Sequence, residues 1–145
     1  MRALLQRVSQ ASVRVEGEVT GAIDRGLLVL LGLDKGDDPR TAERMLDKLL
    51  AYRVFPDASG RMNCSVADID GGVLLVSQFT LSADTRKGLR PSFSSAMPPD
   101  EARQLYDFTL QALAGRHREV AAGVFGAQME VSLTNDGPVT FLLES

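Results

Sequence analysis

Residues 26–33 are GLLVLLGL, a continuous apolar run with one glycine at its start and another near its end. The run is short for a helix and carries no polar side chain, which predicts a central β-strand covered on both faces. A second apolar run, Val73 to Val76, follows the turn Asp70-Gly71-Gly72 and predicts another buried strand.

The N-terminal segment predicts a hairpin. Ala11, Val13 and Val15 alternate with polar residues, which is the period of a half-buried strand. The turn residues 16–18 follow, and the apolar pattern returns over 19–23.

Two helices are predicted. Asp38 suits the N-cap of the first helix and Pro39 its first helical position. The first helix then presents one apolar face, made of Ala42, Met45, Leu46, Leu49 and Leu50. The second helix begins at residues 98–101, where acidic side chains suit the helix dipole, and is predicted to end at Gly115.

The C-terminal part predicts strands at 119–125 and 128–134, a tight turn at Asn135-Asp136-Gly137-Pro138 and a last strand at 139–143. Strands outnumber helices, so we predict an α+β fold in one domain, residues 1–145. It consists of a curled, mostly antiparallel, barrel-like sheet or sandwich with two main helices packed on one side.

The composition narrows the function classes. The chain has 145 residues, a net charge of −3 and one cysteine, Cys64. The negative charge argues against a protein that coats DNA or RNA by bulk electrostatics. One thiol forms no internal disulfide, the N-terminal residues lack a signal-peptide pattern, and no apolar run is long enough for a bilayer. We therefore expect a cytoplasmic protein without a membrane or DNA partner.

The sequence lacks the residues that several common catalytic centres need. The single histidine, His117, is too few for a histidine-based zinc site, and we expect it to be a solvated surface residue. Cys64 has no basic neighbour and is expected to be non-catalytic. No G-x-S-x-G, Walker A or G-x-G-x-x-G motif occurs. We therefore expect neither a metal nor a cofactor.

Two segments remain as functional candidates. Ser77-Gln78-Phe79-Thr80-Leu81 follows a buried strand, a common place for functional groups, although alone it can be a mere strand end. Asn135-Asp136-Gly137-Pro138-Val139-Thr140 can likewise be a mere turn. Together they resemble the two signature motifs of the D-aminoacyl-tRNA deacylase family. The basic loop 87–93 and the opening residues 1–8 are similar to that family too.

The resemblance implies a metal-independent ester hydrolase. Members of the family cleave the ester of D-aminoacyl-tRNA, and of tRNA mischarged with glycine, and release free tRNA and the amino acid. They act as homodimers in which each active site is completed by the other subunit. The implied partners are therefore the 3′ end of aminoacyl-tRNA and a second copy of the chain.

The resemblance also implies roles for named residues. Ser77, Gln78, Phe79 and Thr80 would form the catalytic segment, with backbone N–H groups near Phe79 and Thr80 as an oxyanion hole. A threonine nucleophile needs a base, and the sequence places none nearby, so we favour attack by water with help from the tRNA 2′-OH.

The resemblance assigns specificity and tRNA binding to residues outside the segment 77–80. The partner's Gly137 and Pro138, as a cis dipeptide, would collide with an L side chain and spare D and glycyl esters. Arg7 and Asn135 would support that dipeptide. The basic side chains of Arg86, Lys87 and Arg90 would contact tRNA phosphates.

Three other functions stay open on sequence alone. A deacylase for L-aminoacyl esters is compatible with the fold, but the Gly137-Pro138 dipeptide argues against it. A non-catalytic dimeric module that binds RNA or a small ligand is not excluded, because the proposed catalysis depends largely on backbone groups. A structural homo-oligomer has no feature in its favour.

Overall fold

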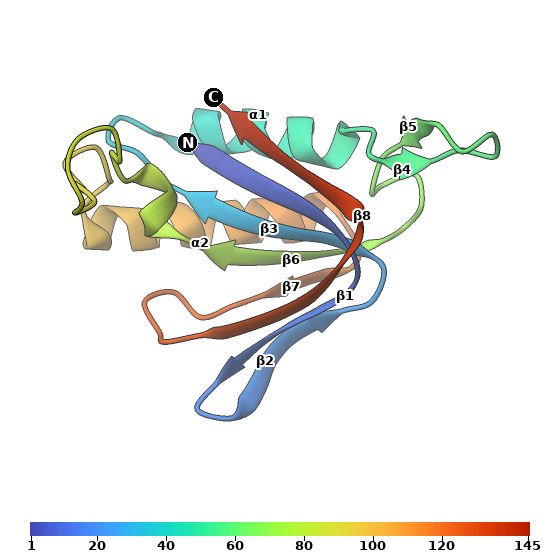
Figure 1. The fold of residues 1–145 in the computed structure, drawn as a ribbon, viewed down its shortest axis with the longest axis horizontal. Helices are drawn as coiled ribbons and strands as arrows, with labels where there is room; N and C mark the ends of the chain where they lie inside the picture. The colour runs from blue at the N-terminus through green and yellow to red at the C-terminus, as the bar shows by residue number, and fades with distance from the viewer.

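Strand β3, Gly26–Gly32, lies at the centre of the sheet, as its apolar run predicts. It pairs antiparallel with β1, Arg2–Val15, and parallel with β6, Gly72–Ser77. The computed structural model describes all residues, 1–145 (Figure 1). No helix is long and apolar enough to cross a membrane.

Strand β1 is long enough to belong to two parts of the sheet. Its first half pairs with β3, and its second half forms the predicted hairpin with β2, Glu18–Ile23. Strand β8, Glu130–Glu144, pairs antiparallel with both halves. Strand β7, Val120–Ala122, pairs parallel with β6. The predicted strand at 119–125 is therefore shorter than expected, and the predicted curled sheet of mostly antiparallel pairings is confirmed.

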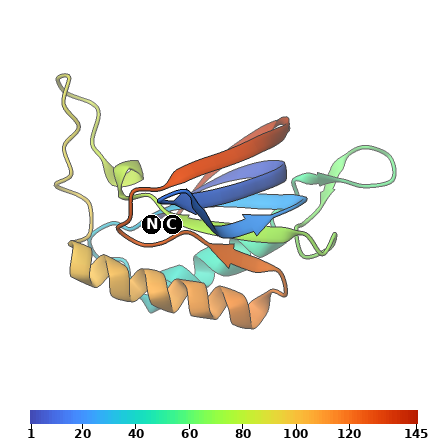
Figure 2. The ribbon, with the colours of Figure 1, turned by 90° about the horizontal axis from the view of Figure 1, so that it is seen from below.

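Both helices pack on one face of the sheet, as predicted (Figure 2). Helix α1, Pro39–Ala51, begins at the expected cap, where Asp38 accepts hydrogen bonds from the Thr41 backbone N–H at 2.8 Å and the Thr41 hydroxyl at 2.9 Å. These bonds hold the pKa of Asp38 below its ordinary value. Helix α2, Pro99–Arg116, continues one residue past Gly115. Two short strands, β4 (Phe55–Pro56) and β5 (Met62–Cys64), form a separate pair.

The side chains of β3 divide between two apolar clusters, as expected for a strand covered on both faces. Leu27, Val29 and Leu31 join the cluster that includes the helices. Leu28 points into the smaller cluster inside the curl of the sheet, together with Val8 of β1. The core thus anchors β3 and β6 on both sides and fixes the position of the segment that follows β6.

The tight turn predicted at residues 135–138 is wrong. β8 continues in one direction through these residues, with Asn135 opposite Val8 and Thr140 opposite Gln6. Residues 136–139 therefore face only Arg7 of β1. Because both flanks pair with the same strand in the same direction, the chain cannot reverse, and the extra residues form a bulge.

Candidate active site

Strand β6 delivers the first motif to one end of the sheet. It ends at Ser77, and the 3₁₀ helix η1, Phe79–Ser82, follows after Gln78. The first bond of η1 runs from the Leu81 N–H to the Gln78 carbonyl at 3.1 Å. The preceding N–H groups, those of Phe79 and Thr80, have no partner within the helix. The chain thus presents two adjacent backbone donors where the rigid strand ends.

The polar side chains of this segment contact one another. The Gln78 side-chain amide donates to the Thr80 hydroxyl, and no histidine, lysine or carboxylate hydrogen-bonds that hydroxyl. Thr80 is exposed, whereas Ser77 and Gln78 are half-buried. A threonine hydroxyl without a base within hydrogen-bond reach is a poor nucleophile.

A cleft of about 540 Å³ opens beside Ser77, Gln78 and Phe79. Its walls come from the end of β3, the start of α2 and the connection between β7 and β8. They include Leu33, Met97, Pro99, Ala102, Phe125 and Met129. A mostly apolar cleft with a few polar groups at one side suits a small organic group. Thr80, Gly137 and Pro138 are not among its lining residues.

Sequence reasoning missed the wall formed by residues 125–129. The pattern there predicts parts of two strands, yet the residues form the connection between β7 and β8. Gly126, with a φ of 76°, lies in this connection, and a glycine within an apolar segment was the available signal of a loop. The guanidinium carbon of Arg103 in α2 lies 4.8 Å from the centre of the Phe125 ring, so a cation packs on this part of the wall.

The second motif forms the bulge of β8. Gly137-Pro138 is a cis peptide, and both residues are exposed. Gly137 has a φ of 152°, and an added Cβ would lie 2.6 Å from both the backbone nitrogen and the Cγ2 atom of Val139. Val139 is buried in the core. A side chain at 137 would therefore collide with an anchored neighbour, which makes glycine necessary there.

Arg7 and Asn135 hold the bulge in place. The Arg7 guanidinium donates to the carbonyl oxygens of Asp136 at 2.8 Å and Val54 at 2.7 Å. Asn135 accepts from the Val139 N–H at 2.7 Å and donates to the Thr140 hydroxyl at 3.0 Å. The bulge is thus fastened at its start by Arg7 and across its base by Asn135.

The two motifs lie far apart within one chain. Arg2 donates to the carbonyl oxygen of Leu81 in η1, whereas Arg7 donates to that of Asp136 at the bulge. Five residues of strand β1 span about 17 Å. Figure 1 shows η1 and the bend of β8 at opposite ends of the sheet. One subunit therefore does not bring the two motifs together.

The basic loop forms an arm, defined here as residues 83–95. Backbone bonds between Asp84 and Ser92 close its base, and Arg86 forms an ion pair with Asp84 at 2.7 Å. The hydrogen bonds from Arg86 hold the pKa of Asp84 well below its ordinary value. Lys87 and Arg90 are exposed and form no ion pair. The two free charges of the arm are thus those of Lys87 and Arg90.

The expectation that His117 is a solvated surface residue is wrong. The residue is half-buried, and its Nε2 atom lies 2.6 Å from the carbonyl oxygen of Gly71. It joins the end of α2 to the start of β6, because the helix ends beside the turn that precedes that strand. Cys64 is a free, half-buried thiol in β5. No cluster of three or more His, Cys, Asp or Glu side chains suited to a metal ion occurs.

Comparison with known proteins points to one family. The family model described as D-Tyr-tRNA(Tyr) deacylase matches residues 4–144. A D-aminoacyl-tRNA deacylase of Cellvibrio japonicus (strain Ueda107) is 60% identical over 144 residues and covers 99% of both chains. A D-aminoacyl-tRNA deacylase of Stutzerimonas stutzeri (strain A1501) is 61% identical over 145 residues and covers 100% of both.

Two solved structures share the fold. One, named c-Myc DNA Unwinding Element Binding Protein, has a TM-score of 0.96 and 45% identity, with 100% of this chain and 99% of that chain covered. The other, described as a probable eukaryotic D-amino acid tRNA deacylase, has a TM-score of 0.82 and 17% identity, with coverage of 98% and 97%. At that identity the second likeness concerns the fold alone.

Proposed function

Because the chain belongs to the D-Tyr-tRNA(Tyr) deacylase family and is a D-aminoacyl-tRNA deacylase, we propose that it rejects L-aminoacyl esters through Gly137-Pro138 and also hydrolyses glycyl-tRNA. The observation that carries the proposal is the braced, exposed bulge of β8, which Arg7 and Asn135 fasten. A rigid backbone obstacle excludes an L side chain by collision, whereas a D side chain points away and glycine has none.

The site is completed by a second copy of the chain in this proposal. The bulge and η1 lie at opposite ends of the sheet, so one subunit cannot supply both to the same ester. Strand β8 pairs only with β1 and leaves its other edge unpaired. It also exposes large apolar side chains on both sides of the bulge, namely Val131, Leu133, Phe141 and Leu142. An open edge with exposed apolar side chains suits a homodimer contact.

The chemistry uses water. The ester carbonyl lies beside the backbone N–H groups of Phe79 and Thr80, which stabilise the negative oxygen of the tetrahedral intermediate; one such donor contributes about 3–4 kcal/mol. Water attacks the carbonyl carbon, the bond to the ribose oxygen breaks, and that oxygen takes the proton. The neighbouring 2′-OH of the tRNA assists the attack, and correct placement contributes about 7–11 kcal/mol. Gln78 holds the substrate's amino group or ribose.

The tRNA end approaches along the arm in this proposal, with Lys87 and Arg90 on its phosphates. A solved relative is named as a DNA-unwinding-element-binding protein. The net charge of −3 disfavours binding to a long duplex by bulk electrostatics, so tRNA is the partner proposed here. Cytoplasm is the proposed compartment, since charged tRNA is used there.

The test is deacylation of matched D- and L-tyrosyl-tRNA, with glycyl-tRNA alongside. We expect rapid loss of the D and glycyl esters and survival of the L ester. Equal loss of the D and L esters would refute the Gly137-Pro138 filter. Binding of charged tRNA without turnover would instead favour the non-catalytic module.

A further inference from the structure

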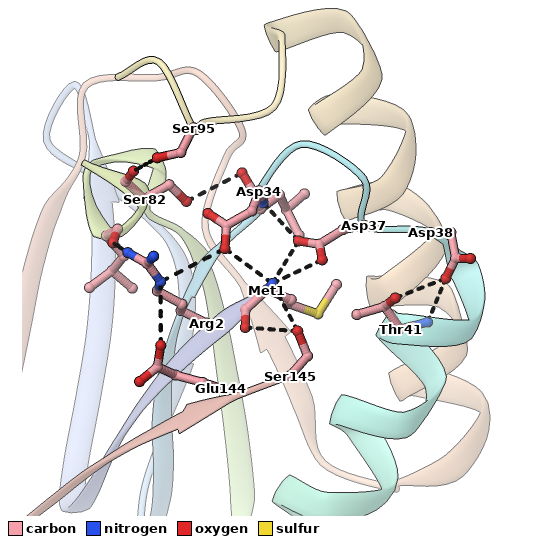
Figure 3. A network of polar contacts seen from close by, with 12 residues as sticks. Met1, Arg2, Asp34, Asp37, Asp38, Thr41, Ser82, Ser95, Glu144 and Ser145 are labelled. Carbon is pink, nitrogen blue, oxygen red and sulfur yellow. Dashed lines mark hydrogen bonds and ion pairs between the residues drawn. The ribbon is translucent and has the colours of Figure 1, made fainter. Parts of the chain in front are cut away.

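A charged network occupies the end of the sheet next to η1 (Figure 3). The Met1 ammonium is buried and donates to Asp34 at 3.2 Å, to Asp37 at 2.9 Å and to the Ser145 hydroxyl at 3.0 Å. Asp37 also accepts from the Asp34 N–H at 2.7 Å. The loop after β3 is thus fixed around a buried positive charge, and the Asp34 side chain is held at the start of β1.

Arg2 links this network to η1. Its guanidinium donates to the Leu81 carbonyl at 2.7 Å. The Nε atom lies 3.7 Å from a carboxylate oxygen of Asp34 and 3.7 Å from one of Glu144. Two carboxylates on different elements therefore orient one guanidinium, which leaves a donor directed at the backbone of η1.

The segment η1 depends on such outside contacts. A helix of four residues has little stability of its own. It also packs closely against the end of β3, where an added Cβ at Gly32 would lie 2.9 Å from the Cβ of Leu81, and the Ser95 hydroxyl donates to the Ser82 carbonyl at 2.7 Å. Ser82 donates to the Leu33 carbonyl at 3.3 Å. Arg2 is the one charged side chain that hydrogen-bonds the backbone of η1.

We propose that Arg2, oriented by Asp34 and Glu144, is a positioning residue for deacylation. By holding the Leu81 carbonyl it fixes the rotation of η1, and with it the direction of the N–H groups of the two preceding residues, Phe79 and Thr80. This inference rests on the proposed function, in which those groups stabilise the oxyanion. Arg2 does not touch the ester and acts only through the backbone.

The experiment compares Arg2→Met and Arg2→Lys by steady-state kinetics on D-tyrosyl-tRNA. Arg2→Met keeps the apolar stem and loses every donor, so we expect kcat to fall about ten- to a hundredfold with KM nearly unchanged. Lysine can reach one partner at a time and should restore part of kcat. The amide NMR signals of Phe79 and Thr80 should shift in Arg2→Met and return toward their original positions in Arg2→Lys.

Arg116→Met is the matched control. Arg116 pairs with Glu43 and Asp47 between α1 and α2 and has no contact with η1, so kcat should stay at the wild-type value. A wild-type kcat in Arg2→Met would overturn the inference. So would a loss of kcat in both Arg2→Met and Arg116→Met that is explained by partial unfolding of each variant. Failure of the chirality filter is seen separately, as equal D and L rates in the unmodified protein.

Discussion

Arg7 connects two stretches of chain that are distant in sequence, because one guanidinium donates to the carbonyls of both Val54 and Asp136. Its side chain is only 12% exposed, and the bond to Val54 is partly buried, whereas the bond to Asp136 lies at the surface. Val54 precedes β4, and Asp136 begins the bulge. The bulge is therefore fixed relative to the core and not only to its own strand.

Arg7→Met should loosen the bulge. Loss of two hydrogen bonds from a charged donor should lower the free energy of unfolding by about 2–4 kcal/mol. It should also raise the rate of L-tyrosyl-tRNA hydrolysis relative to the D ester. Chemical denaturation and paired D/L assays measure the two effects. Arg7→Lys keeps one donor, so its stability and its D/L rate ratio should lie between those of the wild type and Arg7→Met. An unchanged D/L ratio in Arg7→Met would contradict the role of Arg7 in holding the bulge.

Tyr106 gives the fold a dependence on alkaline pH. It is buried in α2, donates to the Leu75 carbonyl at 3.0 Å, and its burial raises its pKa to about 12. The unfolded chain loses this proton near pH 10 and the folded chain near pH 12. The folded state thus binds the proton more tightly, and the stabilisation is complete below pH 10 and disappears as the pH rises to 12.

The free energy of unfolding of the wild-type protein should therefore decline between pH 10 and 12. In Tyr106→Phe this decline should be smaller by about 3 kcal/mol. At neutral pH the variant should lose only about 1 kcal/mol, since the Leu75 carbonyl keeps its bond from the Gly123 N–H at 3.0 Å. Urea unfolding at several pH values measures both quantities. The other tyrosine, Tyr52, is common to both proteins, so it cancels in the comparison.

At the scale of elements, the arm separates its charges by geometry. Arg86 is paired with Asp84 at the base, whereas Lys87 and Arg90 stand free near the tip. A Lys or Arg side chain that binds a phosphate releases counterions from the nucleic acid, and a side chain already paired with a carboxylate does so less.

Lys87→Ala with Arg90→Ala should therefore weaken tRNA binding and make it less sensitive to salt. Two lost contacts to a single-stranded end should reduce the slope of log K against log salt by about 1.4. Arg86→Ala is the comparison variant and should change the slope less. Filter-binding titrations at several salt concentrations measure this; an unchanged slope in the double variant would remove the arm from the binding surface.

Most elements were predictable because they carry a regular period. The apolar runs of β3 and β6, the β1–β2 hairpin and the cap at Asp38 all depend on local patterns. The bulge was not predictable. Asn-Asp-Gly-Pro residues favour a turn locally, and only pairing of both flanks with β1 shows that the chain continues straight.

The site was predictable in part. The structure places Ser77, Gln78 and Phe79 at a cleft, and it places Arg7 and Asn135 in contact with the bulge. The wall at 125–129, the contact of His117 with Gly71 and the contact of Arg2 with η1 depend on tertiary contacts that no local spacing reveals. Met1 and Asp34 are likewise 33 residues apart in sequence.

For the whole molecule, the separation of the two motifs allows a test by complementation. Gln78→Ala should remove the side chain that holds the substrate, and Gly137→Val should displace the bulge through its collision with Val139, so each homodimer should be inactive. When the two variants are mixed and reassembled, a hybrid dimer contains one subunit of each kind. One of its two sites then combines an unchanged η1 with an unchanged bulge and is intact. A 1:1 mixture should therefore recover about a quarter of the wild-type rate, because half of the dimers are hybrids with one working site of two. No recovery in verified hybrids would contradict the shared site.

The bulge of β8 has a consequence for how such proteins diversify. Four residues stand opposite one, yet pairing with β1 resumes on both sides. The exposed positions 136 and 138 can therefore change without altering the sheet register, whereas Gly137 and the buried Val139 are constrained by close contact. Stereochemical preference can then be re-engineered at those two exposed positions while the rest of the chain keeps its structure. The same strand thus combines paired flanks that hold the sheet with a short segment in which two positions can vary.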